Sequence, residues 1–215
     1  FNNVQETESI RETEAYQHIN NLLIEAGKPA GVGSPVFTLE GKPSNFNSIA
    51  WDPSREKFLV GTLERGEILA VSENGQVESL VEAEESNGLW AVTGLAVDEQ
   101  NNRLWVSSSA IPVFSGYSEA DSNRGALVEL DLESLEVKAR YDLPEDELQH
   151  ELGSVAIADD GTTYVIDRKA RSIYLKAPEN DRLVPFFTSP ELTGLTDIAV
   201  AGDNSKIYVS DPAKG

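Results

Sequence analysis

The chain contains no cysteine and no methionine, and only two of its 215 residues are histidines. Without cysteine, disulfides, zinc–thiolate sites and thiol nucleophiles are all excluded. Basic residues are scarce as well: 17 of them stand against 37 acidic residues, and the net charge of −20 repels phosphate backbones and anionic lipid headgroups. No apolar run approaches the roughly 18 residues that a membrane-spanning helix needs. We therefore expect neither nucleic acid nor a membrane as a partner.

The missing methionine also means that the sequence does not begin at an initiator residue. We expect Phe1 to follow a removed signal peptide, a removed tag, or an excision from a longer protein.

One segment near the start is amphipathic. Ser9 and Glu12 fit an S-x-x-E capping box, and the apolar residues that follow share one stripe of a helix. We expect a helix at 9–26 that packs against a neighbouring domain, with binding of a partner protein as the alternative. Gly and Pro residues then form a linker. We expect two domains: the helix and linker at 1–33, and a β-strand domain at 34–215.

The remainder of the chain is β-patterned and repetitive, with short apolar strands, turn residues and no further helical periodicity. A strand that ends in an acidic turn occurs four times, as SIAWD, GLAVD, SVAIAD and DIAVAGD, and a second strand follows each copy. The first three copies continue into a third and a fourth strand. Spacings of 46, 60 and 43 residues separate the equivalent positions Ile49, Leu95, Val155 and Ile198.

Four strands in every roughly 40 to 50 residues are typical of β-propeller blades, whereas a β-sandwich would lack so regular a register. The fourth copy stops after two strands. We therefore expect an all-β propeller of four-stranded blades, incomplete at the C-terminus, of which this chain covers about three and a half. A strand at Val36 to Leu39 is expected to complete the final blade, because an open array leaves an unpaired edge.

Strand direction places several side chains on one face of such a propeller. In an antiparallel meander, the starts of the first strands and the loops between strands two and three share this loop-bearing face. Four residues immediately precede the first strands and are expected to point toward the central channel: Asn47, Thr93, Gly153 and Thr196. The expected ligand-binding side chains of the channel are those of Thr93, Ser154 and Thr196.

The loop at 108–124 accounts for the extra length of the second repeat, and loops this long are often lids or binding loops. We expect Phe114, Tyr117 and Arg124 to contact a ligand, with a self-packed surface loop as the alternative. Two acidic runs border the same face, at 78–85 and 142–151. They would favour a cation or a hard metal such as calcium, with solvated carboxylates as the alternative.

Acid–base chemistry has one candidate residue. His18 falls on the polar side of the expected helix, whereas His150 lies close to the channel position of the third repeat and is the expected proton-transfer group. No Ser–His–Asp constellation, phosphate-binding loop or His pair with metal-ligand spacing can be assigned.

The repeats, together with the segment GLAVDEQNNRLWVSSSAIPVFSGYSEADSNRGALVELDLESLEV and its long loop, resemble the senescence-marker-protein, gluconolactonase and luciferin-regenerating-enzyme family. The resemblance covers roughly residues 36–215. It implies six blades, calcium or another divalent metal at the channel mouth, and hydrolysis of lactones or related esters through a metal-polarised carbonyl. A secreted or periplasmic location is the corresponding expectation.

This chain departs from the family pattern at the metal ligands that the resemblance implies. Asn47 stands where the family has a metal-binding Glu, and Gly153 and Thr196 stand where Asn is common. The adjacent Asp197 would supply a carboxylate, and His150 resembles a histidine often seen upstream of the third-blade turn.

We therefore expect a propeller that binds a small molecule or a protein on its loop-bearing face, with a degenerate metal site formed by Asn47 and Asp197. The first alternative is a divalent-metal-dependent lactone or ester hydrolase that uses His150 for proton transfer. The second is a structural role in which the N-terminal helix docks a neighbouring domain.

Overall fold

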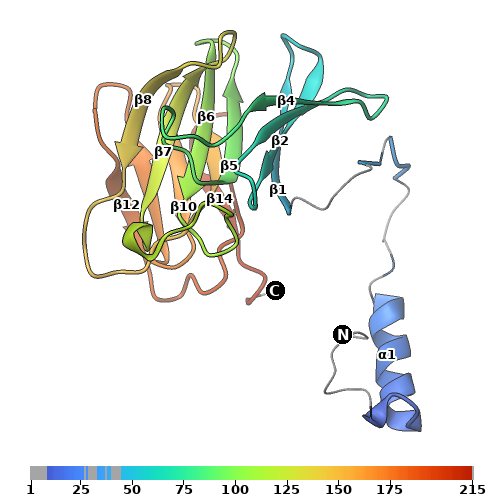
Figure 1. Ribbon diagram of the computed structural model, residues 1–215. Helices are drawn as coiled ribbons and strands as arrows, with labels where there is room; N and C mark the ends of the chain where they lie inside the picture. Colours follow the sequence, from blue (N-terminus) through green and yellow to red (C-terminus); the bar gives the residue numbers. More distant parts are fainter. Residues whose placement is uncertain (1–8, 27, 29–32, 37, 40–44, 215) are drawn as a thin grey trace. The chain divides into compact units, whose positions relative to one another are not determined.

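The structure is a computed structural model that describes residues 9–26, 28, 33–36, 38–39 and 45–214. Contacts divide the chain into two units, Phe1–Val36 and Phe37–Gly215, and each is described by itself. The first unit contains the helix α1 (Glu14–Ala26) (Figure 1). No helix in the described part of the chain is long and apolar enough to span a bilayer.

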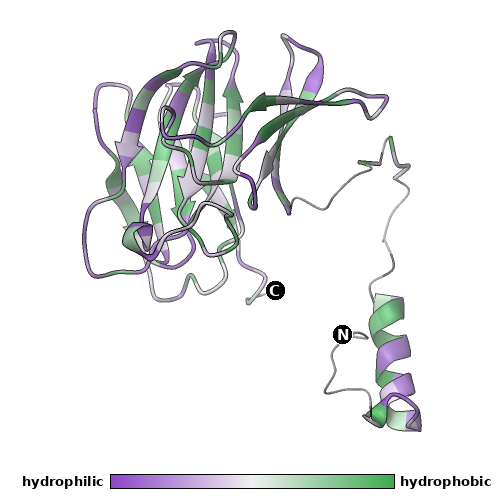
Figure 2. Cartoon of the chain, viewed as in Figure 1, coloured by the Kyte–Doolittle hydropathy of each residue, from purple (hydrophilic) through white to green (hydrophobic). Residues whose placement is uncertain are grey.

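The helix α1 begins later than the expected Ser9. Thr13 is its N-cap, because the Thr13 hydroxyl accepts a 3.3 Å hydrogen bond from the backbone N–H of Tyr16. Ser9 and Ile10 form a separate 3₁₀ turn. No described residue of α1 is buried, and the ribbon of the helix alternates between hydrophobic and hydrophilic residues in Figure 2. Docking of this helix stays a prediction.

The second unit consists of antiparallel β-sheets. The first sheet contains β1 (Phe46–Asp52), β2 (Lys57–Thr62), β3 (Ile68–Val71) and β4 (Val77–Val81). The second contains β5 (Ala91–Asp98), β6 (Arg103–Ser109), β7 (Gly125–Asp131) and β8 (Val137–Asp142). The third contains β9 (Leu152–Ile157), β10 (Thr163–Asp167), β11 (Ser172–Lys176) and β12 (Val184–Thr188). The strands β13 (Asp197–Val200) and β14 (Ile207–Ser210) form the last pair.

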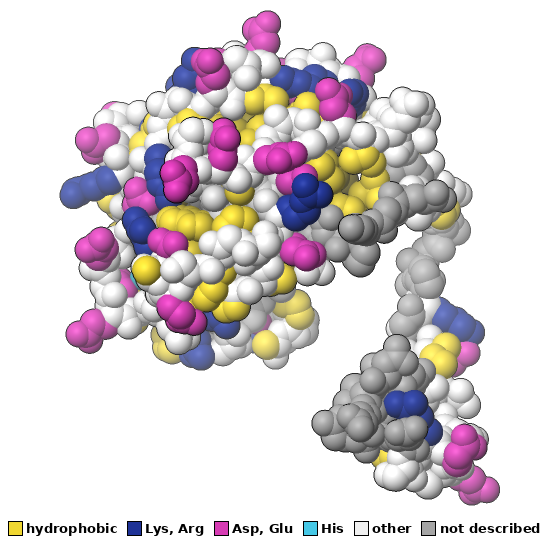
Figure 3. Space-filling model, viewed as in Figure 1, with side chains coloured by type: hydrophobic (Ala, Val, Ile, Leu, Met, Phe, Trp, Pro, Cys, Tyr) yellow, Lys and Arg dark blue, Asp and Glu magenta, His cyan; other side chains and the backbone are white. Residues whose placement is uncertain are grey.

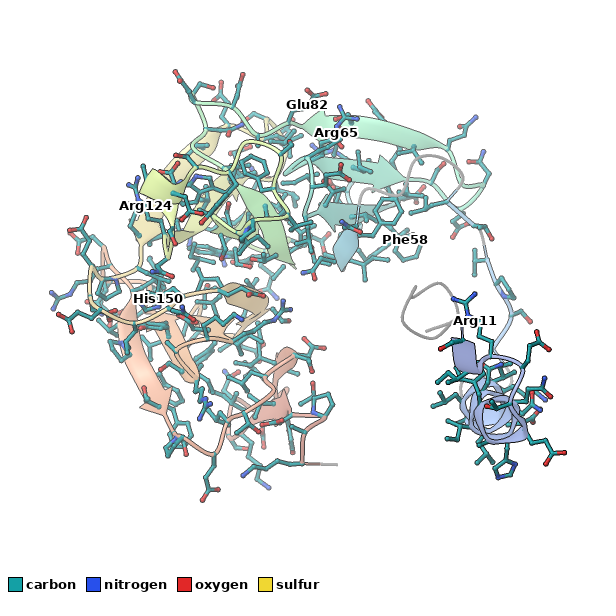
Figure 4. The ribbon with its side chains drawn as sticks, turned by 60° about the horizontal axis from the view of Figure 1, so that its bottom comes forward. Arg11, Phe58, Arg65, Glu82, Arg124 and His150 are labelled. Carbon is teal, nitrogen blue, oxygen red and sulfur yellow. The ribbon has the colours of Figure 1, made fainter. Side chains whose placement is uncertain are left out.

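Each sheet is a meander in which neighbouring strands follow one another in sequence. The first strands β1, β5, β9 and β13 lie next to one another, and the four sheets follow an arc in Figure 4. The expectation of an all-β propeller with four-stranded blades, of which about three and a half are present, is confirmed.

Apolar clusters between successive blades hold this arrangement. Leu59, Ile68 and Val106 belong to the cluster that joins the first two blades, and Trp105 and Val155 belong to the one between the second and third. A smaller cluster joins the third blade to the last pair of strands. Fully burying one such side chain contributes about 1.5 to 3 kcal/mol. The stacking of the sheets thus fixes where each first strand enters the channel.

The acidic turns behave as the sequence predicts in three repeats. The carboxylate of Asp52 accepts a hydrogen bond from the backbone N–H of Ser54 at 2.9 Å, and Asp98 and Asp203 make equivalent bonds. In the third repeat it is Asp160, which accepts from the N–H of Thr162 at 2.9 Å.

The strand expected at Val36 to Leu39 is not found. Val36, Thr38 and Leu39 have no regular secondary structure, and Phe37 lies outside the described residues. Among the described residues, the sheet of β13 and β14 therefore has two strands.

Acidic side chains are spread over the visible face of the propeller unit in Figure 3, among fewer basic ones.

Candidate functional site

A cavity of about 440 Å³ lies where the first strands meet. Five residues predicted from the sequence line it together: Asn47, Thr93, Ser154, Thr196 and Asp197. Arg168, which the sequence analysis did not single out, lines it as well. We call this space the channel cavity.

Bulges at the starts of the first strands aim these side chains. Asn47 and Thr93 do not simply precede their strands, as predicted, but lie inside β1 and β5 at positions where the pairing register shifts. In β9 the shift falls at Gly153 and Ser154. An extra residue in one strand redirects its neighbours and strengthens the local twist, which is why bulges are common next to functional sites.

Hydrogen bonds between blades hold the cavity wall in place. The side-chain amide of Asn47 donates to the carbonyl of Thr93 at 2.7 Å, and the Ser107 hydroxyl donates to the carbonyl of Gly153 at 2.5 Å. The hydroxyl of Thr93 is buried and lies 3.1 Å from that of Ser107. The carbonyl of Thr93 therefore joins the first two blades, whereas its hydroxyl is used within the second blade. The more accessible hydroxyls are those of Ser154 and Thr196.

Arg168 reaches the channel cavity because Gly153 has no side chain. A Cβ atom at Gly153 would lie 2.8 Å from Arg168 Nε, so any larger residue would displace the guanidinium. Arg168 Nη1 lies 3.4 Å from Glu151 Oε1. Within the described residues, Arg168 Nε is buried and has no hydrogen-bond partner. Arg168 directly follows β10, the second strand of its blade. Because second strands end on the loop-bearing face, this position could have indicated Arg168 from the sequence.

Asp197 brings a negative charge to the same cavity. Its Oδ1 accepts hydrogen bonds from the hydroxyl of Ser154 and from the backbone N–H of Ile198, the latter at 2.9 Å. Among the described ion pairs, Asp197 and Arg168 are not joined to each other. The cavity thus holds one guanidinium and one carboxylate that do not neutralise each other directly.

A divalent cation in this cavity would need oxygen ligands. Ca²⁺ takes six to eight of them, and its affinity rises with the number of carboxylates. No group of three or more His, Cys, Asp or Glu side chains that could hold a metal ion occurs in the described part of the chain. The channel cavity offers the amide oxygen of Asn47 and the carboxylate of Asp197, beside the guanidinium of Arg168. These two side-chain oxygen ligands, only one of them a carboxylate, are fewer than the six to eight oxygens that Ca²⁺ takes.

His150 lies elsewhere, between two carboxylates at the connection from the second blade to the third (Figure 4). Its Nδ1 is 2.6 Å from Asp167 Oδ2, and its Nε2 is 3.0 Å from Asp146 Oδ1. The hydrogen bond to Asp167 is the main cause that raises the pKa of His150 above 6.5, against the opposing effect of burial. A charged imidazole carries a proton on each nitrogen and donates to both carboxylates, so it would have to lose one of these protons before it could act as a base.

The long loop at 110–124 folds back onto the first blade. The backbone N–H of Ser115 donates to the carbonyl of Glu64 at 2.8 Å. Arg124 lies in this loop (Figure 4) and lines a second cavity, of about 430 Å³, together with Phe114 and Trp90. The guanidinium carbons of Arg124 and Arg140 lie 5.4 and 4.7 Å from the centre of the Trp90 ring.

Tyr117 is half-buried in the same loop, where its N–H donates to the carbonyl of Phe114 at 3.0 Å. Arg124 also lines a third cavity together with His150. The structure thus separates the predicted residues. Tyr117, Arg124 and His150 do not line the channel cavity. Tyr117 and Arg124 belong to the long loop, and His150 to the connection between β8 and β9.

No protein-family model matches the chain, and no curated protein matches it. Solved structures do. A catalytically inactive virginiamycin B lyase from Staphylococcus aureus with quinupristin is 12% identical over 81% of this chain and 52% of its own, with a TM-score of 0.59. A streptogramin B lyase is 13% identical over 82% and 51%, with a TM-score of 0.56. The Swd1 β-propeller domain of Myceliophteria thermophila is 13% identical over 78% and 48%, with a TM-score of 0.50.

The chain spans about half the length of these proteins. At such low identity the likeness concerns the fold alone. The chain therefore shares the β-propeller fold with them.

Proposed function

We propose that this propeller is a ligand-binding module of gluconolactonase-like architecture with a degenerate metal site, and that a small polar molecule binds in the channel cavity. The observation that supports this function is the composition of the cavity. It combines the hydroxyls of Ser154 and Thr196 with one guanidinium and one carboxylate in about 440 Å³. Volumes of roughly 300 to 1,000 Å³ with a few convergent polar groups are usual for small-molecule sites.

The alternative is a divalent-metal-dependent lactone or ester hydrolase. Asn47 and Asp197 favour it, since both line the channel cavity. Arg168 opposes it, because the positive charge disfavours a cation there. His150 opposes it too, because it lines the cavity beside Arg124 and is held by two carboxylates. The two lyases among the similar structures show that this fold accommodates enzymes, but fold alone does not confer chemistry.

A binding screen on the full chain tests the proposal. NMR titrations with sugars, polyols, lactones, carboxylic acids and amino acids should find at least one class that shifts the signals of the channel cavity. Ser154→Ala should weaken that binding about tenfold, as expected for one lost hydrogen bond to a charged or polar ligand. The matched control Ser205→Ala changes an exposed serine in the turn between β13 and β14 and should have no effect.

Calcium titration by calorimetry addresses the hydrolase. Micromolar binding that disappears in Asn47→Ala would favour the metal enzyme over the ligand-binding module. If no compound class perturbs the channel cavity, small-molecule binding there is wrong.

A further inference from the structure

We infer that the ligand of the channel cavity is a small zwitterion, whose carboxylate binds Arg168 and whose ammonium group binds Asp197. This inference rests on the proposed function and gives the ligand its chemical class. Its basis is the pair of opposite charges that line one cavity without forming an ion pair with each other.

Arg168 has unused hydrogen-bonding capacity. A guanidinium carries five N–H donors in a planar fork that matches a carboxylate. Among the described residues, the guanidinium of Arg168 makes one hydrogen bond, from Nη1 to Glu151 Oε1 at 3.4 Å. Its Nε is buried and has no partner there. A carboxylate in the cavity would bind the terminal N–H donors of the guanidinium that the bond to Glu151 leaves unused.

Asp197 is held in a fixed orientation but keeps an oxygen available. Ser154 and the N–H of Ile198 both bond to Oδ1. No hydrogen bond reaches Oδ2 in the described part of the structure. Because the Asp197 side chain is exposed, an ammonium group can approach this oxygen directly.

A ligand with one charge would be recognised less well than one with both. An anion would meet Arg168 but lie near Asp197 and experience the repulsion of a protein with a net charge of −20. A cation would meet Asp197 but lie near Arg168. A zwitterion satisfies both groups and is neutral overall, and the hydroxyls of Thr196 and Ser210 line the same cavity to bond its polar centre.

Three forms of one peptide separate these possibilities. The tripeptide Gly-Ser-Gly is a zwitterion, its N-acetyl form is an anion, and its C-terminal amide is a cation. In NMR titrations of the full chain, we expect the free tripeptide to bind about tenfold more tightly than either blocked form, because each blocked form loses one charge-assisted contact.

Two variants assign each end of the peptide. Arg168→Gln should remove the advantage of the tripeptide over the amide, and Asp197→Asn should remove its advantage over the N-acetyl form. Arg168→Lys keeps the charge but loses the planar fork, so it should retain part of the advantage and shows whether the site still folds. The controls Arg171→Gln and Asp159→Asn change exposed charges outside the cavity lining and should leave both ratios unchanged.

The outcomes distinguish the two proposals. If a compound that is not a zwitterion, such as a sugar, polyol, lactone or carboxylic acid, occupies the cavity while amino acids do not bind and all three peptide forms bind equally or not at all, the zwitterion is wrong and the ligand-binding module stands. If nothing occupies the cavity, both are wrong.

Discussion

Replacing His150 with alanine should destabilise the propeller unit by about 3 kcal/mol near pH 6. The side chain of His150 is only 2% exposed and Asp167 is fully buried, with 2.6 Å between His150 Nδ1 and Asp167 Oδ2. Removal of one member of a buried ion pair costs about 3 to 5 kcal/mol, because the other charge is left without its partner. Asp167 Oδ1 keeps backbone N–H donors from Glu151, Lys169 and Ala170. These bonds place the expected loss at the lower end of that range.

The size of the effect should depend on pH with a definite sign. The pKa of His150 in the folded protein is raised above 6.5, chiefly by the hydrogen bond to Asp167. The stabilisation is therefore fully present below about pH 6.5, the ordinary pKa of histidine, and is lost as the pH rises through the raised pKa of the folded state. The difference in unfolding free energy between wild type and His150→Ala should accordingly shrink between pH 6 and pH 9.

Urea unfolding of the full chain, followed by tryptophan fluorescence at several pH values, measures this difference. Asp146→Asn is the matched control, because Asp146 is the exposed partner of His150 and an exposed ion pair contributes only about 0 to 1 kcal/mol. A loss for His150→Ala that stays the same from pH 6 to pH 9 would refute the charged imidazole. A loss below about 1 kcal/mol at every pH would refute the buried pair itself.

The propeller could be predicted because its signals are local. Each strand carries its own apolar pattern, and each acidic turn closes on its own backbone, as Asp52 and Asp203 show. Strand alternation then placed Asn47, Thr93 and Thr196 on one face without any knowledge of packing. The structure brings these residues into one cavity for the same reason.

The features that escaped prediction depend on contacts between distant residues. Arg168 enters the channel only because Gly153 leaves room for it. Gly153 lies fifteen positions earlier in the sequence, on the neighbouring strand β9. The partner Asp167 of His150 is likewise 17 residues away in sequence. The helix start was missed for a different reason: Thr13 competes with Ser9 as a cap, and the hydrogen bond to Tyr16 decides between them.

Two further predictions concern the scaffold around the channel. Asp52→Asn should cost about 1 to 3 kcal/mol, because the Asp52 carboxylate is fully buried and bonds Arg55 Nη1 at 2.6 Å; thermal melts measure the loss, and an unchanged melting temperature would contradict it. Gly94→Ala should destabilise more than an ordinary surface substitution, by about 1 to 3 kcal/mol or more, because a Cβ atom there would overlap the carbonyl oxygen of Gly153 on the adjacent blade. Gly202→Ala is its matched control, since a Cβ atom at Gly202 would meet nothing within 4 Å. Equal melting temperatures for these two glycine variants would mean that the first strands are not packed as closely as the channel cavity requires.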